Sequence, residues 1–321
     1  MSEALEIRCG SCGTPAEPED RFCERCGARL LEAERDEHGC RVCDAPRAKI
    51  DSDGFCSVCG ARERVDRREL DLVTAAVVSD RGRVHHRNED AFALEVMDDG
   101  SVAAVICDGI SSSSAGDTAA RTAAEAAAAV LTGGAADVDQ LVAAIGAAQD
   151  AVAEVGWTTR AGRGMPSCTL VSALWRDGEL AITSIGDSRA YWVDIAQANQ
   201  LTVDESWAQE QIEQGVLTPE QAFSDSRSHS ITNWIGADAP ERIPRVSRTA
   251  PDAPGKLVLC TDGLWNYLAD AAELHELVSA LPADASPAAV AESLTETALA
   301  RGGRDNITVA VIEIEPTGAP R

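Results

Sequence analysis

Short apolar runs that end in turn residues alternate with alanine-rich amphipathic stretches along most of this chain. The run Val102–Cys107 is apolar throughout, which predicts a buried strand, and it leads directly into Asp108 and a glycine. The run Leu257–Cys260 leads in the same way, after one threonine, into Asp262 and a glycine. A carboxylate at the end of a core strand is costly unless something neutralises its charge. The two strands therefore indicate carboxylates that converge on a cation, although each Asp-Gly pair by itself also fits an ordinary turn.

The same patterning predicts the other elements of a large domain. Further strands are expected at residues 72–79, 91–96, 167–175, 179–185, 189–194, 231–237 and 306–314. Helices are expected at residues 115–131, 138–155, 206–223, 271–281 and 287–301, the last capped by Ser286 and stopped by two glycines. Because the strands follow one another with hairpin turns and the helices arrive in pairs, the expected fold class is α+β. Two antiparallel sheets would pack face to face, with the helices outside.

The first sixty residues carry a different pattern, in which Cys-x-x-Cys pairs replace apolar runs. Eight of the 11 cysteines form two sets, namely Cys9, Cys12, Cys23 and Cys26, followed by Cys40, Cys43, Cys56 and Cys59. Four thiolates at such spacing are typical of a structural zinc site, and a segment with so few apolar residues needs metal to fold. The two sets resemble tandem zinc ribbons, at residues 1–33 and 34–62, and predict two structural Zn²⁺ ions. The alternative, a redox-active Cys-x-x-Cys, lacks the expected βαβ context.

Charge divides the chain and narrows its partners. The net charge is −25, of which −4 lies before Asp71, where 12 Lys and Arg face 16 Asp and Glu. A chain this acidic repels nucleic acid and anionic membranes, and the −4 argues against ribbons that read nucleic acid. Residues 63–70 predict a solvated linker, with a docking patch as the alternative; residues 71–315 predict one large domain, and residues 316–321 a tail. With no signal peptide or membrane span in the pattern, we expect a cytoplasmic protein.

Acidic side chains recur at the predicted turns of the large domain. They are Glu89, Asp90, Asp108, Asp187, Asp262 and Asp305. Mg²⁺ and Mn²⁺ prefer oxygen ligands and retain several waters, so acids gathered at strand ends match these cations. Two such cations a few ångströms apart can share a water, lower its pKa and clamp a phosphoryl group for in-line attack. The alternative is a set of solvent-exposed loop carboxylates with no shared role.

Seven sequence blocks, in order, resemble the catalytic domain of the metal-dependent Ser/Thr protein phosphatases of the type 2C class. The blocks are SDRGRVHHRNEDAF, AAVICDG, CTLVSALW, ITSIGDSRAYW, LTVDES, KLVLCTDGLWN and GGRDNITVAVI, all within residues 71–315. The resemblance implies a four-layer α-β-β-α sandwich of two antiparallel sheets flanked by helix pairs. It also implies hydrolysis of phosphoserine and phosphothreonine by direct attack of a metal-bridging water or hydroxide, without a phosphoenzyme.

The resemblance assigns metal-binding roles to individual residues. Asp108 would bridge two Mg²⁺ or Mn²⁺ ions, and the carbonyl of Gly109 would bind one of them. Asp262 and Asp305 would bind the other ion, which completes the catalytic set.

Around this set the resemblance places a second group of residues. Glu89 and Asp90 would hold waters on the metals. Asp187 and Asp262 match the family's weaker third metal site. Residues 206–235 match the flap beside the site, where substrate contacts lie in this family.

Three positions depart from the family pattern. Ser111 and Ser112 replace two glycines, which restricts the backbone but offers hydroxyls that can cap the following helix. The family's phosphate-binding arginine is His85 here, and Arg87 is the alternative phosphate ligand, on the same face as His85 if the segment is an extended strand. Asn266 replaces the acid that commonly closes Asp-Gly-Leu-Trp, which weakens the third metal site and spares the other two.

Four further side chains are expected to be structural. Arg189 is predicted to form an ion pair rather than to act in catalysis. The thiols of Cys107, Cys168 and Cys260 lie in apolar strands and are predicted to be plain core residues.

The sequence thus predicts a Mg²⁺- or Mn²⁺-dependent protein phosphatase whose substrates are phosphorylated proteins, products of a Ser/Thr kinase. The ribbons are expected to bind a protein partner, and neither nucleic acid nor membrane is expected as a partner. The alternative, from another class, is a pseudophosphatase that binds phosphorylated or partner proteins without turnover. The retained acids favour the enzyme, whereas the changes at His85 and at Ser111 and Ser112 favour the alternative.

Overall fold

The computed structural model divides the chain into two compact units, Met1–Glu63 and Arg64–Arg321, which we call the N-terminal and C-terminal units. The structure describes residues 7–8, 15–16, 45–46, 49, 56–60, 67–133, 138–158, 163–240, 243–268 and 270–315. In the N-terminal unit, β1 (Ile7–Arg8) and β2 (Pro15–Ala16) pair antiparallel. Six of the eight expected zinc ligands (Cys9, Cys12, Cys23, Cys26, Cys40 and Cys43), the expected boundary between the ribbons and the expected tail at 316–321 lie outside the described residues.

Cys56 and Cys59, the other two expected zinc ligands, flank a tight turn. The amide of Val58 donates to Cys56 Sγ at 3.4 Å, and the amide of Gly60 donates to the Cys56 carbonyl at 2.8 Å. Gly60 has φ +73°, a conformation that glycine adopts without strain. Cys56 is buried and Cys59 is exposed. The turn therefore has the form of a Cys-x-x-Cys-Gly knuckle.

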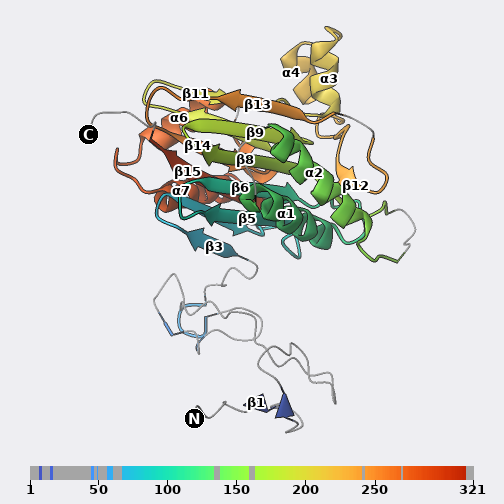
Figure 1. The fold of residues 1–321 in the computed structure, drawn as a ribbon, viewed down its shortest axis with the longest axis horizontal. Coiled ribbons are helices and arrows are strands. Elements are labelled where there is room, and N and C mark those ends of the chain that lie inside the picture. Colours follow the sequence, from blue (N-terminus) through green and yellow to red (C-terminus); the bar gives the residue numbers. More distant parts are fainter. Residues whose placement is uncertain are drawn as a thin grey trace. The chain divides into compact units, whose positions relative to one another are not determined.

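Two antiparallel sheets form the centre of the C-terminal unit (Figure 1). The larger sheet has the order β11-β10-β14-β15-β4-β3, from β3 (Arg68–Asp71), β4 (Ala75–Asp80), β10 (Arg189–Val193), β11 (Ala198–Gln200), β14 (Gly255–Cys260) and β15 (Ile307–Ile314). The smaller sheet has the order β13-β9-β8-β6-β5, from β5 (Asp90–Val96), β6 (Val102–Asp108), β8 (Leu170–Arg176), β9 (Glu179–Ile185) and β13 (Arg245–Thr249). The short strands β7 (Ser167–Cys168) and β12 (Ile235–Gly236) pair with each other.

Helices cover the outer faces of both sheets, which gives the four layers expected from the sequence (Figure 1). The helices are α1 (Gly116–Gly133), α2 (Val138–Ala153), α3 (Trp207–Glu213), α4 (Pro219–Ser224), α5 (Asp262–Trp265), α6 (Ala271–Ser279) and α7 (Pro287–Ala300). The pair α1 and α2 packs on the five-stranded sheet, and α6 and α7 pack on the six-stranded sheet. The α+β sandwich is thereby confirmed.

Three buried apolar clusters fill the three interfaces between these layers. The position of strand β6 between two of these clusters explains why its sequence is apolar without interruption. Val105 packs in the cluster beneath α1 and α2, whereas its neighbour Ile106 packs in the cluster between the two sheets. Since successive side chains of a strand point to opposite faces, a strand covered on both sides needs apolar residues at every position.

Most expected elements are present, and the differences have local causes. The run 167–175 divides into β7 and β8 at Thr169, whose hydroxyl accepts a hydrogen bond from the Asp108 amide at 3.2 Å. The expected helix 206–223 is two helices, because Gly215 with φ +66° interrupts it. The edge strand β13 was not expected, since its sequence RVSRT is polar and mostly exposed, as edge strands often are.

The segment 63–70 differs from the solvated linker that its charges predict. Its last three residues belong to β3. Arg67 has only 3% of its side chain exposed, and its guanidinium forms ion pairs with Asp80 at 3.0 Å and with Glu292. A buried guanidinium held by acids is an anchor, so the sequence reading of this residue as solvated is wrong.

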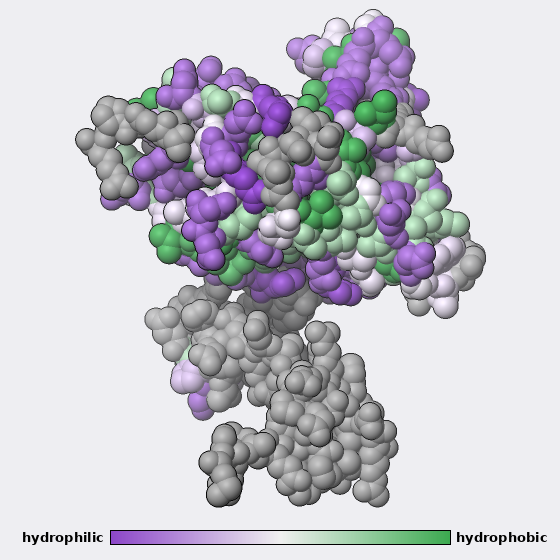
Figure 2. All heavy atoms as spheres, viewed as in Figure 1, coloured by the Kyte–Doolittle hydropathy of each residue, from purple (hydrophilic) through white to green (hydrophobic). Residues whose placement is uncertain are grey.

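Polar residues dominate the visible surface of the C-terminal unit, with paler apolar areas where α1 and α2 lie (Figure 2).

Ser286 caps the start of helix α7, and its hydroxyl accepts from the Ala289 amide, as the sequence predicts. No helix among the described residues is long and apolar enough to cross a membrane.

Candidate active site

Strand ends from both sheets bring acidic residues to one edge of the sandwich. In the five-stranded sheet, Asp90 begins β5 and Asp108 ends β6, and the two are direct register partners. In the six-stranded sheet, Asp262 follows β14 and Asp305 precedes the antiparallel β15. Asp187 precedes β10, which is the other neighbour of β14. Because one antiparallel strand ends where its neighbour begins, each sheet delivers its acids to the same edge.

Hydrogen bonds across the two sheets hold Asp90 in place. Its Oδ2 accepts from the Thr308 hydroxyl at 2.7 Å and from the Thr261 hydroxyl at 2.9 Å. Thr308 lies in β15 and Thr261 directly follows β14, so the larger sheet positions an acid of the smaller one. Sequence reasoning assigned neither threonine a role. The available signal was a hydroxyl within, or at the end of, an otherwise apolar strand.

Burial and mutual repulsion raise the pKa values of Asp90, Asp108, Asp187 and Asp262. Desolvation raises the pKa of Asp90 and that of Asp187 from 3.8 to about 7. Desolvation, followed by the charges of Asp90 and Asp262, raises the pKa of Asp108 well above its usual range. Desolvation and the charges of Asp187 and Asp305 raise the pKa of Asp262 in the same way. Since the charge of Asp305 acts on each of these four acids, the five carboxyl groups form one electrostatic cluster.

Two carboxylate oxygens of this acidic cluster have no hydrogen-bond donor among the described residues, as expected of groups that bind a cation. Oδ1 of Asp90 and Oδ1 of Asp262 are buried and meet no hydrogen-bond donor among the described residues. Oδ2 of Asp262 accepts from Asn266 Nδ2 at 3.1 Å. In the described part of the chain, no three side chains already form a shell of ligands around one point. Mg²⁺ and Mn²⁺ draw much of their shell from water and carbonyl oxygen, so carboxylates that lack donors fit these cations.

Gly109 lies so close to the start of α1 that no larger residue fits. A Cβ there would lie 2.5 Å from the backbone of Gly116 and 2.7 Å from the carbonyl oxygen of Glu89. Ser111, two residues on, donates its hydroxyl to Glu89 Oε2 at 3.0 Å. The sequence suggested that the Ser111 hydroxyl could cap α1. It does not, because it donates to Glu89 and because α1 begins only after Ala115.

The two candidate phosphate ligands contact different acids. His85 Nε2 lies 3.2 Å from Asp305 Oδ1. Arg87 Nε lies 3.2 Å from Glu89 Oε1, and its Nη1 lies 3.1 Å from Asp117 Oδ2. The segment between β4 and β5 contains turns and bends, so the extended strand on which both side chains would share one face is not formed. A role in phosphate binding stays a prediction for each.

Arg189 is structural, as the sequence predicts. Its guanidinium makes a two-pronged contact with Asp204, at 2.9 Å from Nε and 2.6 Å from Nη2. The same group stacks 3.7 Å above the ring of Trp265, whose indole nitrogen donates to the Asp187 carbonyl at 2.9 Å. Arg189 thus supports α5, which carries Asp262 and Trp265, and the loop of Asp187.

The expected flap is tied to the same loop at its base. Glu205 Oε2 accepts from the Gly186 amide at 3.1 Å and from Asn233 Nδ2 at 2.9 Å. These bonds join both ends of the segment that contains α3 and α4 to the acidic edge. Sequence reasoning assigned no role to Glu205 or Asn233.

The three cysteines of the C-terminal unit are core residues, as expected. Cys107, Cys168 and Cys260 are fully buried. Burial raises the pKa of Cys107 well above its usual range and that of Cys260 to about 12. Thiols that resist ionisation are poor nucleophiles, so Cys107 and Cys260 are chemically inert.

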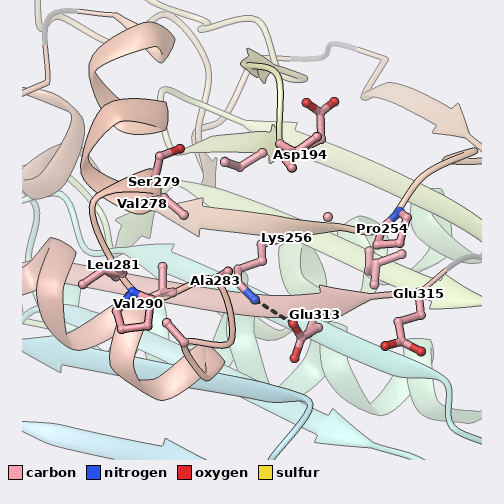
Figure 3. A pocket seen from close by; sticks show the side chains of 16 residues that line it. Asp194, Pro254, Lys256, Val278, Ser279, Leu281, Ala283, Val290, Glu313 and Glu315 are labelled. Atoms are coloured by element: carbon pink, nitrogen blue, oxygen red, sulfur yellow. Dashed lines mark hydrogen bonds and ion pairs between the residues drawn. The ribbon is translucent and has the colours of Figure 1, made fainter. Parts of the chain in front are cut away.

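A separate cavity of about 410 Å³ lies at the opposite ends of β10, β14 and β15 (Figure 3). Apolar side chains such as Leu281 and Val290 line it, and Lys256 forms an ion pair with Glu313 at 2.7 Å. Gly255, which begins β14, belongs to the lining, whereas Asp262 follows the other end of that strand. This cavity is therefore remote from the acidic edge.

Comparison with known protein families identifies the family of this chain. The protein phosphatase 2C family model matches residues 81–298. The chain belongs to the protein phosphatase 2C family. A zinc-ribbon family model also matches residues 8–30, which contain the first four cysteines of the N-terminal unit.

Several bacterial members of the protein phosphatase 2C family are similar to this chain. Serine/threonine protein phosphatase PstP of Mycobacterium tuberculosis is 30% identical over 241 residues, 74% of this chain and 44% of PstP. Serine/threonine phosphatase stp of Listeria innocua is 28% identical over 244 residues, 73% of this chain and 93% of stp. A crystal structure of the PstP catalytic domain with two manganese ions shares 27% identity and a TM-score of 0.59, over 75% of this chain and 98% of that one. The chain spans less than half of the length of PstP.

Proposed function

We propose that this chain hydrolyses phosphoserine and phosphothreonine in proteins and depends on Mg²⁺ or Mn²⁺. The observation that carries the proposal is the convergence of acids from both sheets at one edge, with unpartnered oxygens on Asp90 and Asp262. The named activity of the bacterial relatives and the two manganese ions in the PstP structure support it.

The metal ligands follow from this edge of the sandwich. Asp108, the Gly109 carbonyl, Asp262 and Asp305 would hold two cations directly, and Glu89 and Asp90 would act through water. Asp187 would serve a third site, where neutral Asn266 takes the place of an acid. When bound, two divalent cations would supply positive charge for the phosphoryl oxygens and lower the pKa of a water so that it can attack as hydroxide.

This chain's own residues do the positioning. Thr308 and Thr261 orient Asp90 through its Oδ2, and Oδ1 meets no donor among the described residues. Arg189 fixes the loop of Asp187 through Trp265. The segment that contains α3 and α4 stands beside this edge and is the surface that we assign to the protein substrate. We infer that its substrates are products of a Ser/Thr kinase in the cytoplasm and that the protein acts in signalling.

One comparison of activities tests the proposal. The full chain should hydrolyse p-nitrophenyl phosphate and a phosphothreonine peptide with Mn²⁺, and lose both activities with excess chelator. Equal activity with and without chelator would contradict the metal-dependent mechanism. A folded protein that shows no turnover with any divalent cation would contradict the enzyme itself.

We also propose that the N-terminal unit holds two structural Zn²⁺ ions. The zinc-ribbon match at residues 8–30 supports the first site. The turn around Cys56, with its amide-to-sulfur hydrogen bond from Val58, supports the second, because such bonds stabilise thiolates. Elemental analysis after extensive dialysis should find about two zinc ions per chain. A zinc-free preparation in which this unit remains folded would contradict the assignment.

A further inference from the structure

A polar cavity of about 450 Å³ opens beside the acidic edge, at the start of α1. We call it the Arg163 pocket. Its lining residues are Arg87, Ser114, Ala115, Asp117, Thr118, Gly156, Trp157, Thr158 and Arg163. Arg87 joins it to the candidate active site, because the same guanidinium contacts Glu89 at 3.2 Å. A group bound in this pocket would therefore lie beside a group bound at the acidic cluster.

The pocket offers positive charge in an otherwise acidic protein. Among the described residues, two arginines and one aspartate line it, in a protein with net charge −25. Arg87 is neutralised by Glu89 and Asp117. Arg163 is exposed, and no carboxylate among the described residues forms an ion pair with it. Its Nη1 donates instead to the carbonyls of Ser113, at 2.9 Å, and Ser111, at 3.3 Å. Its positive charge is thus held in place and left available to an anion.

Helix α1 adds a second favourable feature for an anion. It has 18 residues, and it begins after Ala115, which has no side chain that can accept hydrogen bonds from the first turn. Amide groups at a helix N-terminus carry partial positive charge and favour anions.

A buried polar atom in the pocket also points to a ligand. Ser114 is only 6% exposed, and its hydroxyl oxygen meets no hydrogen-bond partner in the described part of the chain. Buried hydroxyls are nearly always partnered, so this one retains a hydrogen bond that it can offer to a ligand in the pocket. An anionic oxygen would accept a hydrogen bond from this hydroxyl.

We propose that the Arg163 pocket binds an anionic side chain of the substrate, a carboxylate or a second phosphate, close to the residue that is dephosphorylated. The proposal rests on the phosphatase function proposed above and narrows it to acidic or multiply phosphorylated substrates. Because Arg87 contacts both the pocket and Glu89 of the candidate active site, the recognised side chain lies near the scissile phosphate in the substrate sequence. Arg163 is a specificity-determining residue in this proposal.

Hydrolysis of matched phosphothreonine peptides tests the pocket. One set carries only alanine and glycine around the phosphothreonine, a second carries one aspartate at successive positions, and a third carries one phosphoserine there. The protein should prefer the best acidic peptide over the neutral one by about tenfold in kcat/KM, the effect of one or two charge-assisted hydrogen bonds. The aspartate and phosphoserine sets show whether a carboxylate suffices or a phosphate is needed. No preference in either set would overturn the proposal.

Variants distinguish recognition from a purely structural role of Arg163. Arg163→Gln should abolish the preference, and Arg163→Lys should retain part of it because the charge remains. Arg121→Gln, on the outer face of α1 where Arg121 lies 3.7 Å from Glu125, is the matched control and should keep the full preference. If Arg163→Gln lowers hydrolysis of neutral and acidic peptides by the same factor, Arg163 only supports the loop and the proposal is wrong.

A binding experiment without turnover keeps this test separate from that of the phosphatase function. Trp157 lines the pocket, so its fluorescence should respond to the acidic peptide in the presence of chelator, and the response should vanish in Trp157→Phe. Binding that weakens with added salt and with Arg163→Gln supports the pocket even if no peptide is hydrolysed. A fluorescence response that is unchanged in Arg163→Gln would overturn it.

Discussion

The hydroxyl of Thr308 donates to Oδ2 of Asp90 at 2.7 Å, across the interface between the two sheets. Ser79 Oγ lies 2.8 Å from Thr308 Oγ1, and Asn88 Nδ2 donates to Ser79 Oγ at 2.8 Å. Since the amide nitrogen of Asn88 can only donate and the ionised carboxylate of Asp90 can only accept, the proton of each hydroxyl is assigned along the chain from Asn88 to Asp90. The asparagine of the Asn-Glu-Asp motif therefore acts through two hydroxyls on the acid two residues later.

Replacement of Thr308 by valine removes the donor and keeps the shape of the side chain. Because Oδ2 of Asp90 then keeps the Thr261 hydroxyl but loses that of Thr308, we expect the unfolding free energy to fall by about 1–3 kcal/mol and the affinity for Mn²⁺ to fall with it. Urea denaturation with chelator and a Mn²⁺ titration measure the two effects. Thr308→Ser restores the hydroxyl and should recover the metal affinity. Equal Mn²⁺ affinity in the valine variant would contradict this role.

Asp262→Asn removes one negative charge from the acidic cluster. Turnover with Mn²⁺ should fall by about a hundredfold or more, because a direct ligand of the proposed cations is weakened. The far-UV circular dichroism should not change. The matched control is Asp252→Asn, which should keep full activity. Asp252 is exposed and precedes β14, whereas Asp262 follows that strand. Full activity in Asp262→Asn would remove this residue from the metal site.

The raised pKa values of Asp90 and Asp187 predict a pH dependence of the metal-free protein. Both pKa values rise from 3.8 to about 7 on folding, so the folded form binds protons more tightly than the unfolded chain. The stabilisation is complete below about pH 4 and is lost as the pH rises towards about 7. The unfolding free energy in chelator should fall over this range, and less steeply in Asp90→Asn. Mn²⁺ should stabilise the protein most near neutral pH, where the carboxylates are ionised. If the unfolding free energy changes equally with pH in the unsubstituted protein and in Asp90→Asn, the raised pKa of Asp90 is not the cause.

Arg67 anchors the start of the C-terminal unit, and its removal leaves Asp80 buried without this cation. Arg67→Met keeps the aliphatic stem and should lower the unfolding free energy by roughly 3 kcal/mol. The neighbouring exposed Arg68, which stacks 4.9 Å from the ring centre of Phe92, gives the control Arg68→Met, with a smaller loss. Equal losses of unfolding free energy in Arg67→Met and Arg68→Met would contradict the role of Arg67 as an anchor.

The fragment from Arg64 onward retains Arg67, so its chemical denaturation should give a cooperative transition.

His85 and Arg87 differ in how far their neighbours neutralise them. Arg87 contacts two carboxylates, whereas His85 contacts Asp305 of the acidic cluster. We therefore expect His85→Ala to raise KM for p-nitrophenyl phosphate more than Arg87→Ala does. The two variants are assayed side by side with Mn²⁺. If Arg87→Ala is the more damaging change, Arg87 is the phosphate ligand, and if neither changes KM, the segment does not contact phosphate.

The sequence by itself determined the local elements and the kind of chemistry. The uninterrupted apolar run of β6 predicted a strand covered on both faces, and the structure places Val105 and Ile106 in two different cores. The recurring acids at strand ends predicted a group of carboxylates at one edge. Both conclusions follow from short-range patterns, because periodicity and turn residues act within a few positions of the chain.

Only the tertiary structure decided which residues support these acids. Asp90 and Thr308 are 218 positions apart, and no local pattern connects a core threonine with a distant carboxylate. The charges around Arg67 predicted a solvated linker, yet strand pairing and α7 bury its guanidinium beside Asp80 and Glu292. Arg163 and Ser114 share a pocket because α1 starts beside Gly109, where the absence of a side chain allows close approach. Desolvation and charge pairing depend on what surrounds a group in space, and that environment is made by the packing of segments that are far apart in the chain.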